Sequence, residues 1–260
     1  MSDDAFFRPD GDGFVATPHT RGPWSDDHAH GGPPAALVVR ALERLLPHGA
    51  LITRVAIDLL RPVPLGARLT VAAEVVRGGR SVTLLAATLR AGDKELTRTQ
   101  AVALRTTTLS LPPLEPPGPL LPAPAGCEPF EFPFFKHPVG YHTAMECRAA
   151  RGRFGVGRFA VWMRARVALV PGEPWSPLGR VVLAADAQSG VSLALDTKRF
   201  SFVNPDFTLH LHRPLEGEWA GIDATTTPWP HGTGLAESLV HDPRGPVGRA
   251  AQSLLIDPVK

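Results

Sequence analysis

A single acidic residue inside an apolar run is the position where the sequence most clearly suggests chemistry. Asp186 follows VVLAA (181–185) and precedes AQSG, after which VSLAL (191–195) is again mostly apolar. Burying a charge without partners is costly, so this carboxylate lies either on the surface or in a functional site. The apolar residues on both sides favour a functional site, in which a carboxylate can accept a proton from a reacting group.

Two other groups of residues have both a chemical and a structural interpretation. His28 and His30, in DDHAHGG, could bind a metal, but two histidines in one loop without a further cluster of ligands more often serve as loop or cap residues. RGRFGVGRF (151–159) is rich in glycine, yet it lacks the Lys-Ser/Thr of a phosphate loop and precedes a strand, which indicates a hairpin. The sequence therefore predicts no metal site.

An internal repeat indicates which elements must position these residues. RPVPLG (61–66) and RPLEGE (213–218) each end a run of alternating apolar and polar residues. Gln100 follows the first motif at the same interval at which Gln252 follows the second. A constant interval without a gap predicts the same module written twice, with Gln100 and Gln252 at equivalent strand positions.

Each module is expected to contain an antiparallel sheet. Apolar and β-branched runs separated by glycine-containing turns predict four strands per module. These strands are predicted at 52–60, 68–77, 81–90 and 94–105 in the first module and at 206–212, 218–226, 233–241 and 246–256 in the second. Segments 130–152 and 157–169 are expected to supply the opening strands of the second module.

A helix is predicted before each four-strand set. The first begins at Pro33-Pro34 and stops at His48-Gly49, and the second runs from Ser176-Pro177 to Leu195. The second helix has almost no polar face and should be buried on all sides. The proline-rich segment between the modules should be extended and semi-rigid. The predicted domains are therefore 1–108 and 130–260, joined by a linker at 109–129.

A nearly all-apolar helix embraced by a curved antiparallel sheet is the hotdog arrangement. Two tandem copies joined by a linker resemble the acyl-CoA thioesterase II family, called TesB-like, from about Phe14 to Ile256. The resemblance implies an α+β fold, a tandem (double) hotdog in which each copy is a long helix wrapped by a curved antiparallel sheet. We expect the two sheets to join edge to edge, because pairing edge strands hides their backbone groups. The segments that carry the resemblance are His30-Gly31-Gly32, Ala184-Ala185-Asp186, His212-Arg213-Pro214, Glu218-Trp219 and Gln252.

The same resemblance implies a catalytic constellation for thioester hydrolysis. The family's Asp falls on Asp186 and its Gln on Gln252, whereas its Ser/Thr falls on Asn204, which has a carboxamide in place of the hydroxyl. Asp186 would activate a water that Gln252 and Asn204 hold from either side. Backbone N–H groups at Gly31 and Gly32 would stabilise the oxyanion. The implied reaction uses no cofactor.

Several alternatives stay open. Polar residues alternate outward in strands, so Gln252 also fits a purely structural role. The missing hydroxyl at Asn204 leaves open a non-hydrolytic hotdog protein that binds acyl-CoA or tailors biosynthetic intermediates. A dehydratase or hydratase is less favoured, because neither predicted helix contains a histidine to act as base. Arg151, Arg153 and Arg158 are candidates to meet the phosphates of CoA.

Composition limits the partners and the compartment. A net charge of +2, with basic residues spread along the chain, indicates no general attraction to nucleic acid or anionic membrane. No window approaches the roughly 20 apolar residues of a membrane span, and the start MSDDAFFRPDGDG lacks the features of a signal peptide. Cys127 and Cys147 fit reduced thiols in a cytoplasmic protein. The expected partner is an acyl-CoA or other acyl thioester substrate, and a homo-oligomer is expected.

Overall fold

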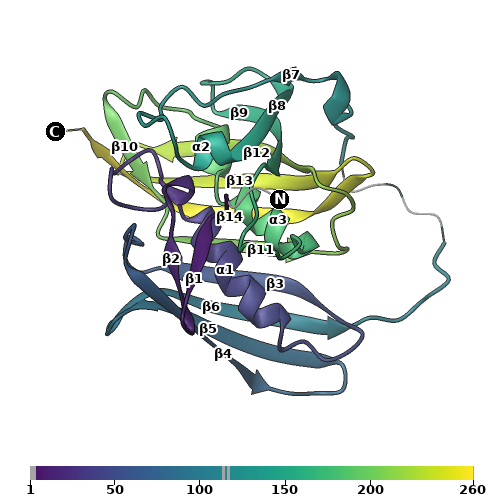
Figure 1. The fold of residues 1–260 in the computed structure, drawn as a ribbon. Coiled ribbons are helices and arrows are strands. Elements are labelled where there is room, and N and C mark those ends of the chain that lie inside the picture. The colour runs from purple at the N-terminus through teal and green to yellow at the C-terminus, as the bar shows by residue number, and fades with distance from the viewer. Residues whose placement is uncertain (1–3, 113–114, 116–117, 260) are drawn as a thin grey trace.

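A single antiparallel sheet runs through the described part of the chain (Figure 1). The computed structural model describes residues 4–112, 115 and 118–259. In these residues the sheet has 14 strands, in the order β1-β2-β4-β5-β6-β3-β11-β14-β13-β12-β9-β8-β7, with β10 beside β14. The strands are β1 (Phe7–Asp10), β2 (Gly13–Ala16), β3 (Ala50–Leu59), β4 (Arg68–Arg77), β5 (Val82–Ala91), β6 (Lys94–Arg105), β7 (Glu128–Pro129), β8 (Met145–Gly152), β9 (Arg158–Ala165), β10 (Phe200–Val203), β11 (Asp206–Leu211), β12 (Ala220–Trp229), β13 (Thr233–Asp242) and β14 (Gly245–Pro258).

The two halves of the sheet meet at β3 and β11. These strands pair antiparallel, from Asp58 opposite Asp206 to Arg54 opposite His210. From this joint, β6, β5 and β4 follow on one side and β14, β13 and β12 on the other, so the two sides mirror each other in strand order. The expected joining of the strands into one continuous sheet is confirmed.

The predicted strands are present, with small shifts at their ends. β4 and β6 coincide with the predicted segments, and β5 begins and ends one residue later. Burial alternates along β5, where Thr83, Leu85, Ala87 and Leu89 face the core. β1 and β2 were not predicted, although the Asp-Gly pairs between them are a hairpin signal.

Two helices lie side by side on one face of the sheet. α1 (Gly32–Glu43) packs on β4 and β5 and lies in front of the β3 to β6 half in Figure 1, whereas α3 (Pro177–Ala185) packs on β9, β12 and β13. Gly32 at the start of α1 lies against Leu183 near the end of α3. At the other end, Ser176 before α3 donates a hydrogen bond to Glu43. The two helices are therefore antiparallel. The short helices are η1 (Pro18–Thr20), η2 (Pro124–Gly126), α2 (Tyr141–Ala144) and α4 (Gln188–Val191).

The second predicted helix is shorter than expected. It ends at Ala185, and α4 resumes only after Asp186 and Ala187. The Ala187 N–H donates to the Ala184 carbonyl, three residues back, which tightens the last turn. The hydroxyl of Ser192, the C-cap of α4, donates to the Gln188 carbonyl, a contact that competes with helix continuation. A continuous helix to Leu195 is therefore wrong, whereas burial of the apolar residues of α3 is confirmed.

Gln100 and Gln252 do not occupy equivalent positions. The Gln252 residue is 1% exposed, whereas Gln100 is exposed. Ala56 and Thr208 precede the two Arg-Pro motifs at the same interval, yet Ala56 pairs with Gln100 and Thr208 pairs with Ala251. A register shift of one residue turns a strand side chain to the opposite face. The gap-free repeat is therefore wrong in this last strand.

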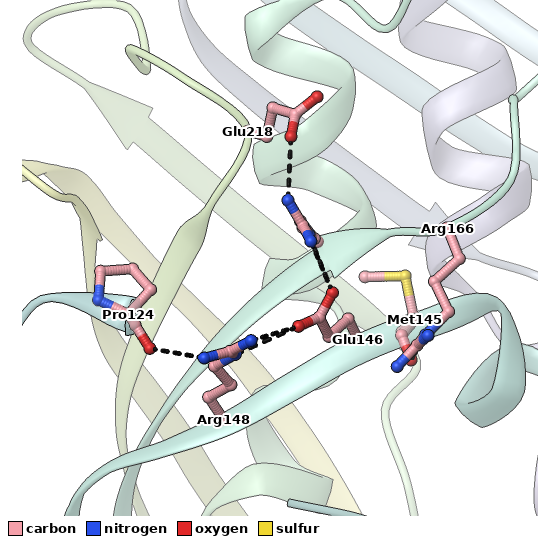
Figure 2. A network of polar contacts seen from close by, with 7 residues as sticks. Pro124, Met145, Glu146, Arg148, Arg166 and Glu218 are labelled. Atoms are coloured by element: carbon pink, nitrogen blue, oxygen red, sulfur yellow. Dashed lines mark hydrogen bonds and ion pairs between the residues drawn. The ribbon is translucent and has the colours of Figure 1, made fainter. Parts of the chain in front are cut away.

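The end of the predicted linker is attached to β8 and β9. Residues 113–114 and 116–117 of the 109–129 segment lie outside the described residues. Trp162 Nε1 donates to the Pro122 carbonyl at 2.8 Å, and Arg148 donates to the Pro124 carbonyl at 3.2 Å. Figure 2 shows that Arg148 is also held by the carboxylate of Glu146. None of the described helices is long and apolar enough to cross a membrane.

Candidate active site

A cavity of about 340 Å³ opens where the start of α1 meets the end of α3, and both halves of the chain line it. Trp24 stacks on Phe134 with ring centroids 5.7 Å apart and meets Phe202 edge-on at 5.1 Å. An apolar lining with a few polar groups is typical of a ligand site. The aromatic residues of the lining are Trp24, Phe132, Phe134, Phe135, Tyr141 and Phe202.

Asp186 supplies the buried charge of this cavity and is 4% exposed. Its Oδ1 accepts a hydrogen bond from Asn204 Nδ2 at 2.9 Å, and its Oδ2 lies 3.0 Å from His30 Nδ1. These partners come from two distant segments and offset the cost of burying the carboxylate. The structure therefore brings Asp186 and Asn204 together at the cavity.

The ends of two helices face the Asp186 carboxylate. Asp186 is the C-cap of α3, where the helix dipole disfavours a negative charge. Gly31 is the N-cap of α1, where the dipole favours one. A Cβ on Gly31 would lie 2.8 and 2.9 Å from the two carboxylate oxygens. The start of α1 therefore counteracts the end of α3, and only glycine permits this close approach.

His30 is a residue of this site that the sequence did not identify as a partner of Asp186. Its ring stacks on Tyr141 with centroids 3.9 Å apart and planes 2° from parallel. The Tyr141 hydroxyl donates to the Leu183 carbonyl at 2.8 Å. Burial raises the pKa of Tyr141 well above its ordinary value, so the phenol remains a neutral donor. The signal for His30 was its place in His30-Gly31-Gly32, directly before α1.

The separation between His30 Nδ1 and Asp186 Oδ2 implies a shared proton. Two lone pairs would repel at 3.0 Å, so a proton lies on one of the two atoms. The Gly32 N–H also points at His30 Nδ1, from 3.1 Å, and that nitrogen can accept it only when unprotonated. The two contacts correspond to two states, one with the proton on His30 and one with the proton on Asp186.

Gly31 and Gly32, the predicted backbone donors, differ in their surroundings. The Gly32 N–H is directed at His30 Nδ1. The Gly31 N–H has no hydrogen-bond partner in the described residues, and Gly31 lines the cavity. The next two residues, Pro33 and Pro34, have no N–H. The start of α1 therefore leaves the Gly31 N–H available to a ligand.

Gln252 is not among the described residues that line the cavity. Its Oε1 accepts a hydrogen bond from Gln188 Nε2 at 3.2 Å, and Gln188 Oε1 accepts one from Ser238 at 2.8 Å. Gln188 begins α4, two residues after Asp186. The Gln252 Nε2 is buried without a partner among these residues, and such a donor is costly to leave unpaired. Gln252 therefore supports the turn that carries Asp186.

The other candidate residues lie in other surroundings. Arg151 forms an ion pair with Asp223, and Arg158 lines a separate groove with Asp223. Burial raises the pKa of the Cys147 thiol to about 12, so this buried cysteine is a poor nucleophile at neutral pH. Among the described residues, no group of three or more His, Cys, Asp or Glu could hold a metal ion.

Comparison with known proteins identifies related domains. The family model described as the acyl-CoA thioesterase N-terminal domain matches residues 20–107, and that of the acyl-CoA thioesterase C-terminal domain matches residues 124–256. A search of curated proteins found no match.

Solved structures share the fold over nearly their whole length. A protein with a hot dog fold from Alicyclobacillus acidocaldarius has a TM-score of 0.76 at 18% identity, covering 99% of this chain and 98% of that one. The tesB protein of Mycobacterium avium subs paratuberculosis has a TM-score of 0.69 at 17% identity, covering 97% and 96%. An acyl-CoA thioesterase II, TesB2, from Mycobacterium marinum has a TM-score of 0.69 at 14% identity, covering 88% and 90%. At these identities, the likeness establishes a hotdog fold.

Proposed function

The chain belongs to the acyl-CoA thioesterase family, which makes it a thioester hydrolase, and we propose that it cleaves an acyl-CoA to a free acid and CoA with a water activated by Asp186. The observation that carries this proposal is the buried carboxylate in an otherwise largely apolar cavity. The acyl group would lie along the aromatic lining, with its thioester carbonyl beside Asp186.

Asp186 and Asn204 together can orient the attacking water. Asn204 uses an Nδ2 hydrogen to bind Asp186, which leaves its side-chain oxygen free to accept from a ligand. A water that donates one hydrogen to Asp186 and the other to the Asn204 oxygen keeps its lone pair for the carbonyl carbon. The carboxamide at this position can therefore perform the orienting role that the family assigns to a hydroxyl.

His30 can accompany the proton transfer. In one protonation state His30 Nδ1–H donates to the ionised Asp186; in the other, Asp186 holds the proton and Nδ1 accepts the Gly32 N–H. As the water attacks, its proton passes to Asp186, and the departing thiolate of CoA must then be protonated. His30 and Asp186 hold one shared proton in the resting state, and the proton taken from the water can return from this pair to the thiolate.

The remaining groups stabilise and support this arrangement. The Gly31 N–H, unpaired in the described residues, would donate to the oxyanion at the positive end of α1. Gln252 holds Gln188 and offers its unpaired Nε2 to a buried water, a more distant role than direct contact with the attacking water. Gly32 contributes by orienting His30.

Two alternatives predict different reactions. A non-hydrolytic protein that binds acyl-CoA is favoured by the absence of the family hydroxyl at Asn204. A hydratase gains support from the pairing of His30 with Asp186, since a histidine base held by a carboxylate can remove or deliver protons next to a thioester. The three functions predict different observations. A thioesterase releases free thiol, a binding protein forms no product, and a hydratase changes the carbon–carbon double bond of an enoyl-CoA.

We propose in addition that the chain is a tandem double hotdog with domains 1–108 and 130–260 and a linker at 109–129. The mirrored strand order and the separate matches to N- and C-terminal domains support this division. A cytoplasmic location and a homo-oligomer belong to the same proposal. The free, buried Cys127 and Cys147 fit a reducing compartment.

Release of free thiol from a panel of acyl-CoAs tests the proposed reaction. We expect turnover of at least one acyl-CoA, with one free thiol and one free acid formed per substrate consumed. An enoyl-CoA and its hydrated form should remain unchanged apart from thioester cleavage. Tight binding of acyl-CoA without thiol release would contradict hydrolysis and favour the binding protein.

A further inference from the structure

A second, open groove adjoins the cavity just beyond the end of β3. Leu60 and Arg61 line both the cavity and this groove. A ligand that leaves the cavity past these two residues therefore enters the groove. We call it the basic groove, and its charged lining consists of Arg61, Arg90, Asp93, Lys94, Glu95 and Arg98.

The basic groove carries an excess of positive charge. Glu95 is its central acceptor: its carboxylate lies 3.2 Å from an Arg90 nitrogen and 2.9 Å from Arg98 Nε. Among the described residues, the Arg61 side chain donates only to the Glu95 backbone carbonyl, at 2.7 Å. Lys94 has no ion pair within the described residues. Four basic side chains thus face two acidic ones, and the arginine ends of the Glu95 pairs are exposed to solvent.

Arginines elsewhere in the molecule also pair with carboxylates, as Arg90 and Arg98 do with Glu95. Figure 2 shows Arg148 against the carboxylate of Glu146, which also binds Arg164. Arg213 opens the second Arg-Pro motif, as Arg61 opens the first, and it pairs with the buried carboxylate of Asp242. Arg61 lacks such a carboxylate partner in the described residues. Among the described residues, the charges of Arg61 and Lys94 are therefore not used in ion pairs.

A short path of contacts connects the basic groove with Asp186. The Leu59 N–H, two residues before Arg61, donates to the Pro205 carbonyl at 2.7 Å. Asn204, adjacent to Pro205, donates to Asp186 at 2.9 Å. The groove therefore begins on the same side of the cavity as the reacting group, outside its apolar lining.

We propose that the basic groove binds the phosphate groups of the nucleotide part of CoA, while the acyl thioester lies in the cavity. This proposal rests on the proposed hydrolysis of acyl-CoA. Arginine forks match phosphate oxygens in pairs, and the open groove suits a polar group that remains in water. The site would make the enzyme selective for CoA esters over thioesters that lack the nucleotide.

A double substitution, Lys94→Ala with Arg98→Ala, tests the groove. The measurements are kcat and KM for an acyl-CoA and for the same acyl group on pantetheine, which has no phosphate. We expect KM for the acyl-CoA to rise by about tenfold at unchanged kcat, with no change for the acyl-pantetheine. Arg244→Ala is the matched control, because Arg244 is also an exposed arginine paired with a glutamate, its side chain 71% exposed against 58% for Arg98.

Direct binding separates this proposal from the hydrolysis itself. Titration with adenosine 3′,5′-bisphosphate should show binding to the parental protein and to Arg244→Ala, weakened about tenfold in the double variant. Binding without any thioester turnover would contradict the hydrolysis and leave the nucleotide site standing. Equal KM values for acyl-CoA in the parental protein and the double variant would contradict nucleotide binding in the basic groove. A loss of activity seen only with acyl esters of an acidic carrier protein, and not with acyl-CoA, would contradict it as well.

Discussion

Asp186 is a buried carboxylate whose partners come from separate parts of the chain. Asn204 and His30 bind its two oxygens, and the N-cap of α1 approaches it from a third side. Each partner stabilises the ionised form through a hydrogen bond or a dipole. These contacts offset the cost of burying the carboxylate and leave it lone pairs to accept a water proton.

Gly31→Ala tests the contact between α1 and this carboxylate. The added Cβ would lie under 3.0 Å from both oxygens, so the Asp186 side chain must move away. A shift of about 1 Å in a reacting group typically costs about a hundredfold in rate, and we expect such a loss in kcat with little change in thermal stability. Gly126→Ala is the control, since a Cβ there meets no atom within 4 Å. Equal activity of both variants would contradict the contact.

Gln252→Ala and Gln100→Ala distinguish the buried glutamine from its exposed counterpart. Gln252→Ala leaves Gln188 Nε2 without its acceptor, so we expect a loss of roughly 1–3 kcal/mol in unfolding free energy and a kcat lower by tenfold to a thousandfold. Gln100→Ala removes an exposed side chain and should change both by little. Denaturant unfolding and thiol release measure the two effects. If Gln252→Ala is destabilised but keeps the parental kcat, Gln252 has a structural role and no role in the reaction.

The sequence identified some residues of the site and missed others for a physical reason. Asp186 stands out because a charge in an apolar run is unusual at any position. His30 does not, since its pairing with Asp186 depends on how two distant segments meet. The face of Gln252 depends on a one-residue register difference between β3–β6 and β11–β14 that alternation within one strand does not reveal.

At the scale of elements, α1 and α3 form an antiparallel pair whose two ends differ. At one end the start of α1 faces Asp186 and the cavity. At the other end the Ser176 hydroxyl binds Glu43, and burial raises the pKa of that glutamate. Arg40 and Glu173 form an ion pair across the same two segments. This end is closed by its own polar contacts, so the helix pair opens to the cavity at one end only in the described residues.

Ser176→Ala tests whether the closed end serves stability alone. Ser176 caps α3 by accepting from the Gly179 N–H at 2.9 Å and donates to Glu43 at 2.7 Å. Losing a helix cap costs about 1 kcal/mol, and the unpaired Glu43 adds to this. We expect a lower midpoint of denaturant unfolding and kcat within about twofold of the parental value. A large loss of kcat at unchanged stability would place this end in the reaction.

Strands were predicted more accurately than the second helix. Alternation and glycine turns are local signals, and they located β4 and β6 to the residue. The break after Ala185 instead depends on tertiary contacts of Asp186 and on Gln188, whose side chain binds Gln252 and Ser238. An apolar run in the sequence does not show that the side chains of Asp186 and Gln188 point in directions that a continuous helix would not allow.

At the scale of the whole molecule, the joint between β3 and β11 creates the site. It places Asn204, just before β11, beside the end of β3, and the cavity is lined from both sides of this joint. Neither half alone contains both His30 and Asp186. One chain with two unlike halves can therefore keep a single candidate carboxylate where identical halves would carry two.

The buried His241 side chain should make the unfolding free energy of the whole fold depend on pH. This histidine is fully buried, both ring nitrogens lack partners in the described residues, and burial lowers its pKa to about 4 from 6.5. Between these values the unfolded chain binds the proton and the folded chain does not, so stability falls as the pH is lowered. We expect a loss of up to about 3 kcal/mol in unfolding free energy from pH 7 to pH 4, measured by urea unfolding.

His241→Leu isolates this contribution, because leucine does not titrate and other groups are unchanged. The difference in unfolding free energy between the parental protein and His241→Leu should change across this range by the amount expected for His241. A difference that is independent of pH would show that His241 is protonated equally in both states.

Asp186→Asn tests the central claim most directly. The substitution keeps the size of the side chain and an oxygen that can accept from Asn204, but it removes the charge that accepts the proton. We predict that kcat for acyl-CoA hydrolysis falls by about 10²–10⁴, while binding of acyl-CoA remains near the parental affinity. Hydrolysis by Asp186→Asn at the parental rate would contradict the assignment of Asp186 as the base and place the reaction elsewhere.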